Sequence, residues 1–242
     1  EGSVQGNQYA GGIAATMKWA TIERCASRVA VSGIEYLGGI VGQMEQTATI
    51  RNCYATGAIQ GQNLLGGIAG HCKDWGADKA NTIENCYATS AITATSSSPY
   101  AGGILGQGMG GFILKNCVAL NPYIKSAGTE KLGGRVVDSA GPNVSGNYAR
   151  EDMKLKPHTS DNTATSANGA SIALGTEQSW NTWFDTTAAA SVWSNYPVQA
   201  LDSGAALPTL SAINLGAEEA PLLPMVVKTL MLSASTEQQI KV

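Results

Sequence analysis

The sequence contains few charged residues and only two histidines. Asp, Glu, Lys and Arg make up 14% of the 242 residues, whereas a typical soluble domain has roughly 25%. The net charge is −3 and there is no basic block, so we expect neither a nucleic acid nor an anionic membrane surface as a partner. His71 and His158 both lie outside any His-Glu-x-x-His pattern, which argues against a zinc peptidase.

The sequence also lacks long apolar runs and the motifs of common enzyme classes. No run reaches the ~18 residues of a membrane-spanning helix, so direct membrane insertion is not expected. There is no Gly-x-Ser-x-Gly elbow, and the glycine-rich stretch 106–111 lacks the Lys-Ser/Thr of a phosphate loop, so we interpret it as a turn. The sequence therefore predicts a chain with no cofactor, no metal ion and no catalytic residues.

Glycine, in contrast, is abundant, and much of it falls in a short block that recurs along the chain. Of the 29 glycines, many occur as Gly-Gly pairs followed by isoleucine. The pairs are Gly11-Gly12, Gly38-Gly39, Gly66-Gly67, Gly102-Gly103 and a degenerate Gly133-Gly134 that is followed by Arg135. Such a pair permits either a positive φ or a close approach of two backbone segments.

A second block follows each glycine pair in the same order. Its central residues are Asn52-Cys53, Asn85-Cys86 and Asn116-Cys117, with the variants Arg24-Cys25 and Asn147-Tyr148 in the first and fifth units. Two blocks that alternate five times indicate a repeat array. About 30 residues per unit suit two or three short strands with turns, so the array predicts an all-β solenoid in which each unit is one coil.

If equivalent residues of successive coils lie above one another, the cysteines form one column and the asparagines another. Parallel side chains ~4.8 Å apart are too distant for a disulfide, whose Cβ atoms lie ~3.8 Å apart, and no Cys-x2-Cys pair suggests zinc. We interpret the cysteines as buried small apolar residues and the asparagines as side chains that hydrogen-bond turns between coils. Cys72 lies outside the column and is predicted to be a free thiol in a loop.

The units resemble the GLUG repeat, a glycine-containing module of secreted and surface proteins of host-associated bacteria. The resemblance covers residues 1–150 and is best at Gly38–Gly57 and Gly66–Thr89. It implies a right-handed parallel β-helix-like fold, an extracellular or outer-surface location and an adhesin-type role without catalytic residues. The first and fifth units depart from the pattern, since Arg24 replaces the asparagine and Asn147 replaces the cysteine.

The repeat pattern stops after residue 150. We expect residues 151–215 to form a capping region over the open end of the solenoid, with a short amphipathic helix over Thr176–Thr186. That segment contains Trp180, Trp183 and Phe184, and a sugar-stacking platform is the alternative interpretation of its aromatic residues. Residues 216–242 are interpreted as a tail or a linker to a further module. Because residue 2 begins in mid-repeat, we expect the chain to be part of a longer protein.

Tyrosines occupy a fixed position two residues before the glycine pair. Tyr9, Tyr36 and Tyr100 share this position, whereas Tyr54, Tyr87 and Tyr148 share one in the second block. The first set is a candidate ligand-binding strip, because a flat ring packs on a sugar face while its hydroxyl stays hydrated. Strict alternation back from Ile13 instead places these rings in the core. Both interpretations stay open at this stage.

The favoured function is a non-enzymatic adhesin-like protein that interacts with a host or microbial glycan or an extracellular protein. One alternative is a polysaccharide-cleaving β-helix enzyme, which requires acidic side chains gathered on one face. Glu23 and Glu84 occupy equivalent positions two coils apart, but we interpret them as solvated turn residues. Another alternative is a passive stalk of a larger surface protein.

Overall fold

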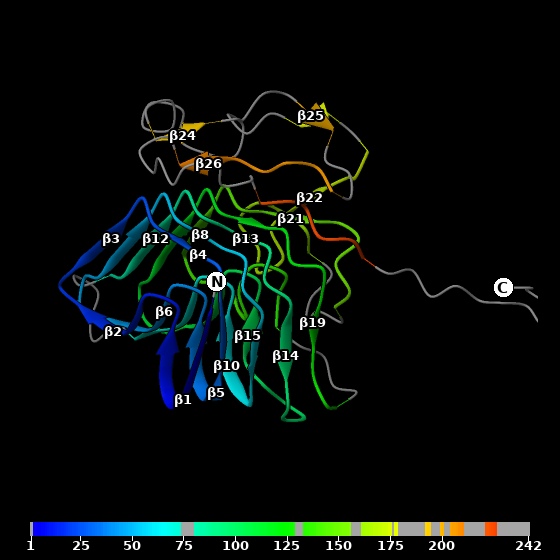
Figure 1. The fold of residues 1–242 in the computed structure, drawn as a ribbon. Helices are drawn as coiled ribbons and strands as arrows, with labels where there is room; N and C mark the ends of the chain where they lie inside the picture. Colours follow the sequence, from blue (N-terminus) through cyan, green and yellow to red (C-terminus); the bar gives the residue numbers. More distant parts are fainter. Residues whose placement is uncertain are drawn as a thin grey trace, which may run out of the picture.

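The computed structural model describes residues 2–73, 80–128, 133–155, 161–175, 177–178, 192–194, 199–200, 204–210 and 221–226. Within these residues the chain is all-β, as predicted, and it winds through about five turns of a parallel β-solenoid (Figure 1). The coils succeed one another from the N-terminal strands to β22, and the strands nearest the C-terminus lie along one side of the stack.

Four parallel sheets run along the solenoid. Sheet A consists of β1 (Gly2–Gly11), β5 (Val29–Gly38), β9 (Ile59–Gly61), β10 (Asn63–Gly66), β14 (Ile92–Ala94), β15 (Ala101–Gly102) and β19 (Ile124–Lys125). Sheet B consists of β2 (Ala14–Lys18), β6 (Val41–Glu45), β11 (Ala69–Lys73) and β16 (Leu105–Gly108). Sheet C consists of β3 (Thr21–Glu23), β7 (Thr49–Arg51), β12 (Thr82–Glu84), β17 (Ile113–Lys115) and β20 (Asn143–Ser145).

Sheet D and two small antiparallel pairs complete the strands. Sheet D consists of β4 (Ala26–Ser27), β8 (Tyr54–Ala55), β13 (Tyr87–Ala88), β18 (Val118–Ala119), β21 (Tyr148–Arg150) and β22 (Ala170–Ile172). The antiparallel pairs are β23 (Glu177–Gln178) with β25 (Gln199–Ala200), and β24 (Trp193–Ser194) with β26 (Thr209–Leu210).

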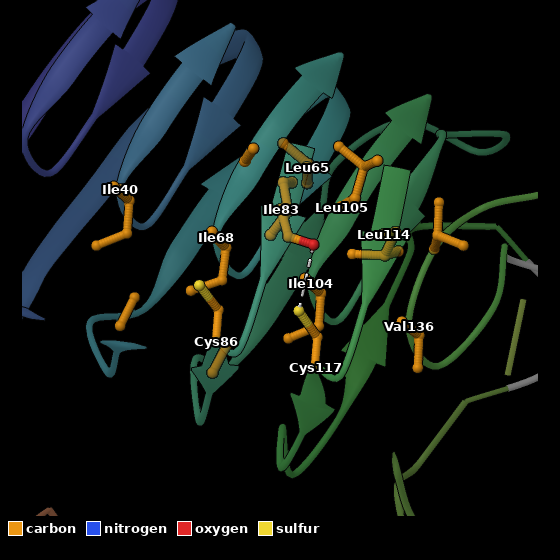
Figure 2. Close-up of a cluster of buried hydrophobic side chains, with 14 of the residues drawn as sticks. Ile40, Leu65, Ile68, Ile83, Cys86, Ile104, Leu105, Leu114, Cys117 and Val136 are labelled. Atoms are coloured by element: carbon orange, nitrogen blue, oxygen red, sulfur yellow. Dashed lines mark hydrogen bonds between the residues drawn. The ribbon is translucent and has the colours of Figure 1, made fainter. Parts of the chain in front are cut away.

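Equivalent residues of successive coils pair in register, which produces columns of identical or similar side chains. Ile83 pairs with Ile50 on one side and with Leu114 on the other. Figure 2 shows the core column formed by Ile40, Ile68, Ile104 and Val136, all of which are fully buried. The hydrophobic effect therefore acts on the same positions in every coil, and a slip of one residue would move each column out of the core.

The second glycine of each pair is required for close packing. A Cβ on Gly67 would overlap the carbonyl oxygen of Gly103 and would lie 2.6 Å from the Cβ of Ala88. Gly39 and Ala55 are related in the same way: a Cβ on Gly39 would lie 2.5 Å from the Cβ of Ala55. None of these glycines has a positive φ. A glycine pair permits either a positive φ or a close approach of two backbone segments, and here the close approach applies. It brings the two repeat blocks together across the core.

The residue before each cysteine has a left-handed backbone conformation. Asn52, Asn85 and Asn116 have φ values of 54°, 52° and 53°, and Gly146 takes the equivalent place with φ of 63°. The intercoil hydrogen bonds at this corner are donated by backbone: the N–H of Asn52 reaches the Glu84 carbonyl at 3.1 Å. The Oδ1 of Asn52 has no hydrogen-bond partner. The side chain of Asn52 hydrogen-bonds the Glu23 carboxylate of the preceding coil, and tolerance of positive φ explains an asparagine at this corner.

The cysteine column lies inside the coil next to this corner. Cys53, Cys86 and Cys117 are fully buried and Cys25 is half-buried; all are free thiols. Each donates to the carbonyl two residues earlier, as from Cys86 to Glu84 at 3.1 Å. Burial raises the pKa of the Cys86 thiol well above its usual range. Figure 2 shows a further contact, from the Cys117 thiol to the Ile83 carbonyl in the preceding coil.

Cys72 is not in a loop, and this prediction was wrong. It lies in β11, is 1% exposed, and its sulfur is 3.6 Å from the sulfur of Met44 in the neighbouring coil. Strand β11 continues the register of β6 as far as Lys73, so the extra residues of this unit begin only after Cys72.

The fifth coil departs from the predicted alignment by one residue. Gly134, not Gly133, bridges Gly102, so Arg135 stands where the other coils have their second glycine. Its guanidinium donates to the carbonyls of Arg150 at 3.2 Å and Gly169 at 2.9 Å. A long side chain fits here because it extends over backbone carbonyls at the end of the stack instead of toward a further Gly-Gly pair.

The end of the stack is closed by residues 161–172. The Ala167 carbonyl accepts hydrogen bonds from the backbone of Val136 at 3.0 Å and Val137 at 3.1 Å, as the isoleucine of an ordinary coil would. Strand β22 then pairs with β21 and extends sheet D. The ordered stack therefore continues past residue 150, the boundary expected for the repeat array.

The C-terminal residues that the structure describes lie on the side of the solenoid, not over its end. Strand β24 lies beside β8 and β13 of sheet D (Figure 1). Its Trp193 is 2% exposed and packs against Tyr54 and Tyr87, with ring centroids 6.3 and 5.7 Å apart. The tryptophan-rich end cap is therefore not found in this part of the chain. Glu177–Gln178 is a strand, which contradicts a helix starting at Thr176. Trp180, Trp183, Phe184 and most of the 216–242 segment lie outside the described residues.

Gly67→Ala is expected to lower the free energy of unfolding by about 1–3 kcal/mol, the range found when a well-packed core is overfilled. The added Cβ meets backbone atoms of Gly103, which cannot change rotamer to make room. Denaturant unfolding measures the change. Gly2→Ala is the matched control, because no atom lies within 4 Å of a Cβ at that position. Equal stability of the two variants would contradict the close-packing explanation.

Asn85→Ala is expected to be less stable than Asn85→Gly by about 1 kcal/mol, because an L-residue with a Cβ is strained at positive φ. Both variants lose the same amide, so the difference between them isolates the effect of the backbone. Thermal unfolding of the two proteins tests it. At Gln5, an exposed strand residue without positive φ, the same two substitutions should show the opposite order of stability.

Candidate functional site: a column of aromatic rings between sheets A and B

Tyr9 and Tyr36 lie on the outside of the solenoid, where sheet A leads into sheet B. Their φ values are 55° and 60°, and Leu64 takes the same conformation in the third coil with φ of 57°. A left-handed residue interrupts the alternation of a strand, so the two-residue period cannot be followed from Ile13 back to Tyr9. Tyr9 is 36% exposed and Tyr36 is half-buried. The interpretation of these rings as core residues is therefore wrong.

The two rings stack on each other, and the Tyr36 ring makes a tilted contact with a histidine of the third coil. Tyr9 and Tyr36 have ring centroids 4.6 Å apart with planes inclined by 18°. Tyr36 and His71 have centroids 5.5 Å apart with a tilt of 54°. Because Tyr36 comes from the coil between the other two, its ring lies between theirs. Tyr36 is therefore the middle ring of this ring column, which we define as Tyr9, Tyr36 and His71.

Tyr100 does not join the ring column. It is 44% exposed, but the equivalent position in the intervening third coil is Leu64, which is 5% exposed and breaks the series. The backbone N–H of Tyr100 is held by the Oδ1 of Asn63 at 2.8 Å. The structure therefore brings together two of the three tyrosines that the sequence predicted as a strip.

His71 and Gln43 place unpaired polar atoms beside the tyrosines. They pair in register on β11 and β6, and are 5% and 2% exposed. Neither ring nitrogen of His71 has a hydrogen-bond partner, and neither does the Oε1 of Gln43. Burial lowers the pKa of His71 to about 4, so the imidazole is neutral at pH 7. Neither residue was predicted from the sequence; the ring contact of Tyr36 with His71 and the register of His71 with Gln43 identify them.

Charged groups around the ring column are mostly paired. Lys18 and Glu45 form an ion pair at 2.8 Å across adjacent coils, and the Gln43 amide donates to Glu45 at 2.6 Å. On the other side, Gln8 donates to Glu35 at 2.7 Å. The region consequently presents aromatic rings without a concentrated charge.

The second set of tyrosines has a different environment. Tyr54 and Tyr87 stack with centroids 5.0 Å apart and planes inclined by 1°, and they are 4% and 0% exposed. The Tyr87 hydroxyl donates to the Pro208 carbonyl at 2.6 Å. These rings belong to a second apolar cluster formed between sheet D and Trp193, Leu207, Leu210 and Leu223. They are buried beneath the C-terminal segment.

The acidic side chains considered for catalysis are paired with bases on the outer face of sheet C. Glu23 lies 2.8 Å from Arg51, and Glu84 lies 2.9 Å from Lys115. The hydrogen bond from Arg51 lowers the pKa of Glu23. A general acid for glycoside hydrolysis needs a raised pKa. The arrangement is an alternating charge ladder across four coils, which suits a solvated surface.

Among the described residues, no group of three or more His, Cys, Asp or Glu side chains is placed to hold a metal ion. That part of the chain also contains no helix of the length and apolar character needed to cross a membrane.

Comparison with known protein families finds one match. The family described as the GLUG motif matches residues 33–60, which run from the end of one coil's sheet A strand to the start of the next. The matched segment includes Tyr36, the Gly38-Gly39 pair and the Asn52-Cys53 corner, and so contains both repeat blocks. Comparisons with curated proteins and with solved structures find no match.

His71→Gln is expected to reduce the loss of stability on acidification. The pKa of His71 falls from 6.5 to about 4 on folding, so between these values the unfolded chain binds a proton that the folded chain does not. The contribution of the neutral imidazole is fully present above pH 6.5 and is lost as the pH falls toward 4. Acidification from pH 6.5 to about 5 covers roughly 1.5 pKa units, so we expect an extra loss of about 2 kcal/mol in the parent chain over that interval.

Glutamine is the matched replacement, because the equivalent residues of the adjacent coils are Gln43 and Gln107. Denaturant unfolding of both proteins at neutral and acidic pH provides the comparison. Parallel pH profiles for parent and variant would show that His71 does not titrate differently in the two states.

Proposed function

We propose that this chain, a GLUG-motif repeat protein with a β-solenoid fold, is a non-enzymatic, adhesin-like protein that binds a glycan through the ring column. In this proposal the protein is secreted or displayed on the outer cell surface of a bacterium. The solenoid serves as a rigid scaffold, and the ring column is the contact surface. The observation that carries the proposal is the stack of Tyr9 on Tyr36 at the surface of the solenoid.

An exposed tyrosine pair suits a sugar in two ways. The exposed part of the Tyr9 ring can pack against the C–H face of a pyranose, and phenol hydroxyls can hydrogen-bond sugar hydroxyls. The stack holds both rings in one orientation, so little side-chain entropy is lost on binding. The surroundings carry little net charge, because Lys18 and Glu45 neutralise each other.

Two features favour binding over cleavage. Glu23 and Glu84 are each held by a basic partner on sheet C, and the pKa of Glu23 is lowered rather than raised. The ring column itself has no pair of carboxyl groups facing a common point among the described residues: Glu45 is engaged by Lys18 and Gln43, and Glu35 by Gln8. These contacts suit a recognition surface.

Tyr9→Ala combined with Tyr36→Ala is expected to weaken glycan binding by at least about ten-fold, because two aromatic contacts are lost together. The parent chain is first screened on an array of host and microbial glycans at neutral pH, and the affinity for a positive glycan is then measured by titration calorimetry. Circular dichroism verifies that the double variant is still folded.

Tyr100→Ala is the matched control, because Tyr100 is exposed but lies outside the ring column. It should bind like the parent chain. If the double variant binds normally, the ring column is not the site. If the parent chain binds no glycan, the role of a passive stalk is favoured instead.

A further inference from the structure

The outer face of sheet C carries its charges in one straight column. The middle residues of its strands, Ile50, Ile83 and Leu114, are fully buried, so the residues on either side of them point outward. The strand register places the charge ladder in consecutive coils, in the order Glu23, Arg51, Glu84, Lys115. The second outward column is uncharged and consists of Thr21, Thr49, Thr82, Ile113 and Asn143.

The charges of the ladder pair within the chain but remain accessible to solvent. Glu23 contacts Arg51 at 2.8 Å and Glu84 contacts Lys115 at 2.9 Å. The hydrogen bond with Glu23 raises the pKa of Arg51, and the charge of Glu84 adds to this effect. The side chains of Arg51 and Lys115 are nevertheless 45% and 43% exposed. Each basic group therefore has acidic neighbours along the column and an open side on which a further acidic group can lie.

The order of the charges makes this face complementary to itself. Along the stack the ladder runs negative, positive, negative, positive, and from the other end it runs positive, negative, positive, negative. A two-fold axis parallel to the strands, between Arg51 and Glu84, places a second copy face to face with its coils in reversed order. Arg51 then lies opposite Glu84 of the second copy, and Glu23 lies opposite Lys115 of the second copy.

The complementarity selects this position of the axis. An axis through Arg51 would oppose that residue to itself and Glu23 to Glu84, so like charges would meet. An axis along the solenoid would oppose the charge ladder to the uncharged column. The axis between Arg51 and Glu84 instead produces opposite charges at all four rungs of the ladder. Its two central pairs involve the second and third coils, so they do not depend on the first coil.

The size of the face indicates a weak and reversible contact. Five strands about 4.8 Å apart, each with three residues of about 3.3 Å, form a face about 24 Å long and 10 Å wide. This is about 240 Å² per copy, whereas a stable interface buries about 800 Å² per partner. Exposed ion pairs are individually weak and are screened by salt, so the association should depend on ionic strength.

We propose that the outer face of sheet C is a self-association surface that takes a second copy of this chain, through reciprocal pairing of Arg51 with Glu84 and of Glu23 with Lys115. The dimer does not depend on the proposed glycan-binding function. If that function holds, a dimer carries two ring columns, and binding to a surface rich in glycans gains avidity.

Single charge reversals and their mixture test the proposal. Arg51→Glu opposes two negative charges at the central pairs, and Glu84→Arg opposes two positive charges, so each variant alone should self-associate at least about ten-fold more weakly than the parent chain. An equimolar mixture should associate again, because one chain then carries two negative charges where the other carries two positive charges. Sedimentation equilibrium at about 20 mM and about 500 mM salt measures the association, which should weaken at the higher concentration.

Lys125→Glu is the matched control. It changes the net charge as much as Arg51→Glu does, but Lys125 is an exposed residue of β19 in sheet A. It should self-associate like the parent chain. Glu84→Arg raises the net charge by two units, from −3 to −1, so overall repulsion cannot explain a loss of association in that variant.

Each reversal also places like charges side by side within the chain, so circular dichroism verifies that both variants are folded. The double variant Arg51→Gln with Glu84→Gln removes the central pairs without adding repulsion. It should self-associate about three-fold or more weakly than the parent chain, which keeps the test valid if a reversed variant does not fold.

Three results would overturn the inference. The first is a parent chain that stays monomeric at millimolar concentration and low salt. The second is a dimer that the charge changes on sheet C leave intact, since its interface would then lie elsewhere. The third is a mixture of folded reversed variants that does not associate. None of these results bears on glycan binding by the ring column, which the array and the calorimetry measure separately.

Discussion

The second glycine of a repeat lies against the alanine that ends the asparagine–cysteine block. Because the glycine has no side chain, the backbone on this side of the coil can approach the opposite side closely. Gly39 meets Ala55, Gly67 meets Ala88, and in the first coil Gly12 meets Ser27 at the equivalent place. A side chain at Gly39 or Gly67 would overlap the facing alanine, so these two positions depend on each other. The width of the coil follows from this contact, and every coil of the same width stacks on the next with the same register.

Because successive coils are alike, the side chains at each position of the repeat form a column and share one environment. Inside, the columns are isoleucines and thiols, which fill the core without polar groups that need partners beyond nearby carbonyls. Outside, the same rule produces the charge ladder of sheet C and the stacked rings of Tyr9 and Tyr36. A binding surface built in this way is rigid, because its side chains support one another and project from hydrogen-bonded strands.

Departures from the repeat occur where the stack meets something other than another full coil. Arg135 replaces a glycine at the last complete coil and ties the Arg150 and Gly169 carbonyls together. Arg150 itself is fully buried, paired with Asp152 at 2.6 Å, and donates to the Pro224 carbonyl of the C-terminal segment at 2.7 Å. That segment covers the Tyr54–Tyr87 stack, whose position on an outer face would otherwise leave two apolar rings in water.

The repeat pattern was sufficient to predict an all-β stack of about five coils, because the order and spacing of two blocks are properties of the sequence itself. The pattern also located the glycines, asparagines and cysteines of the coil. It could not decide which way Tyr9 and Tyr36 point, since a left-handed residue breaks the alternation and positive φ at a tyrosine has no signature in the sequence. Nor could it pair Tyr36 with His71, or place Trp193 on the side of the solenoid. Those relations join residues far apart in the chain, and only the stacking of coils brings them into contact.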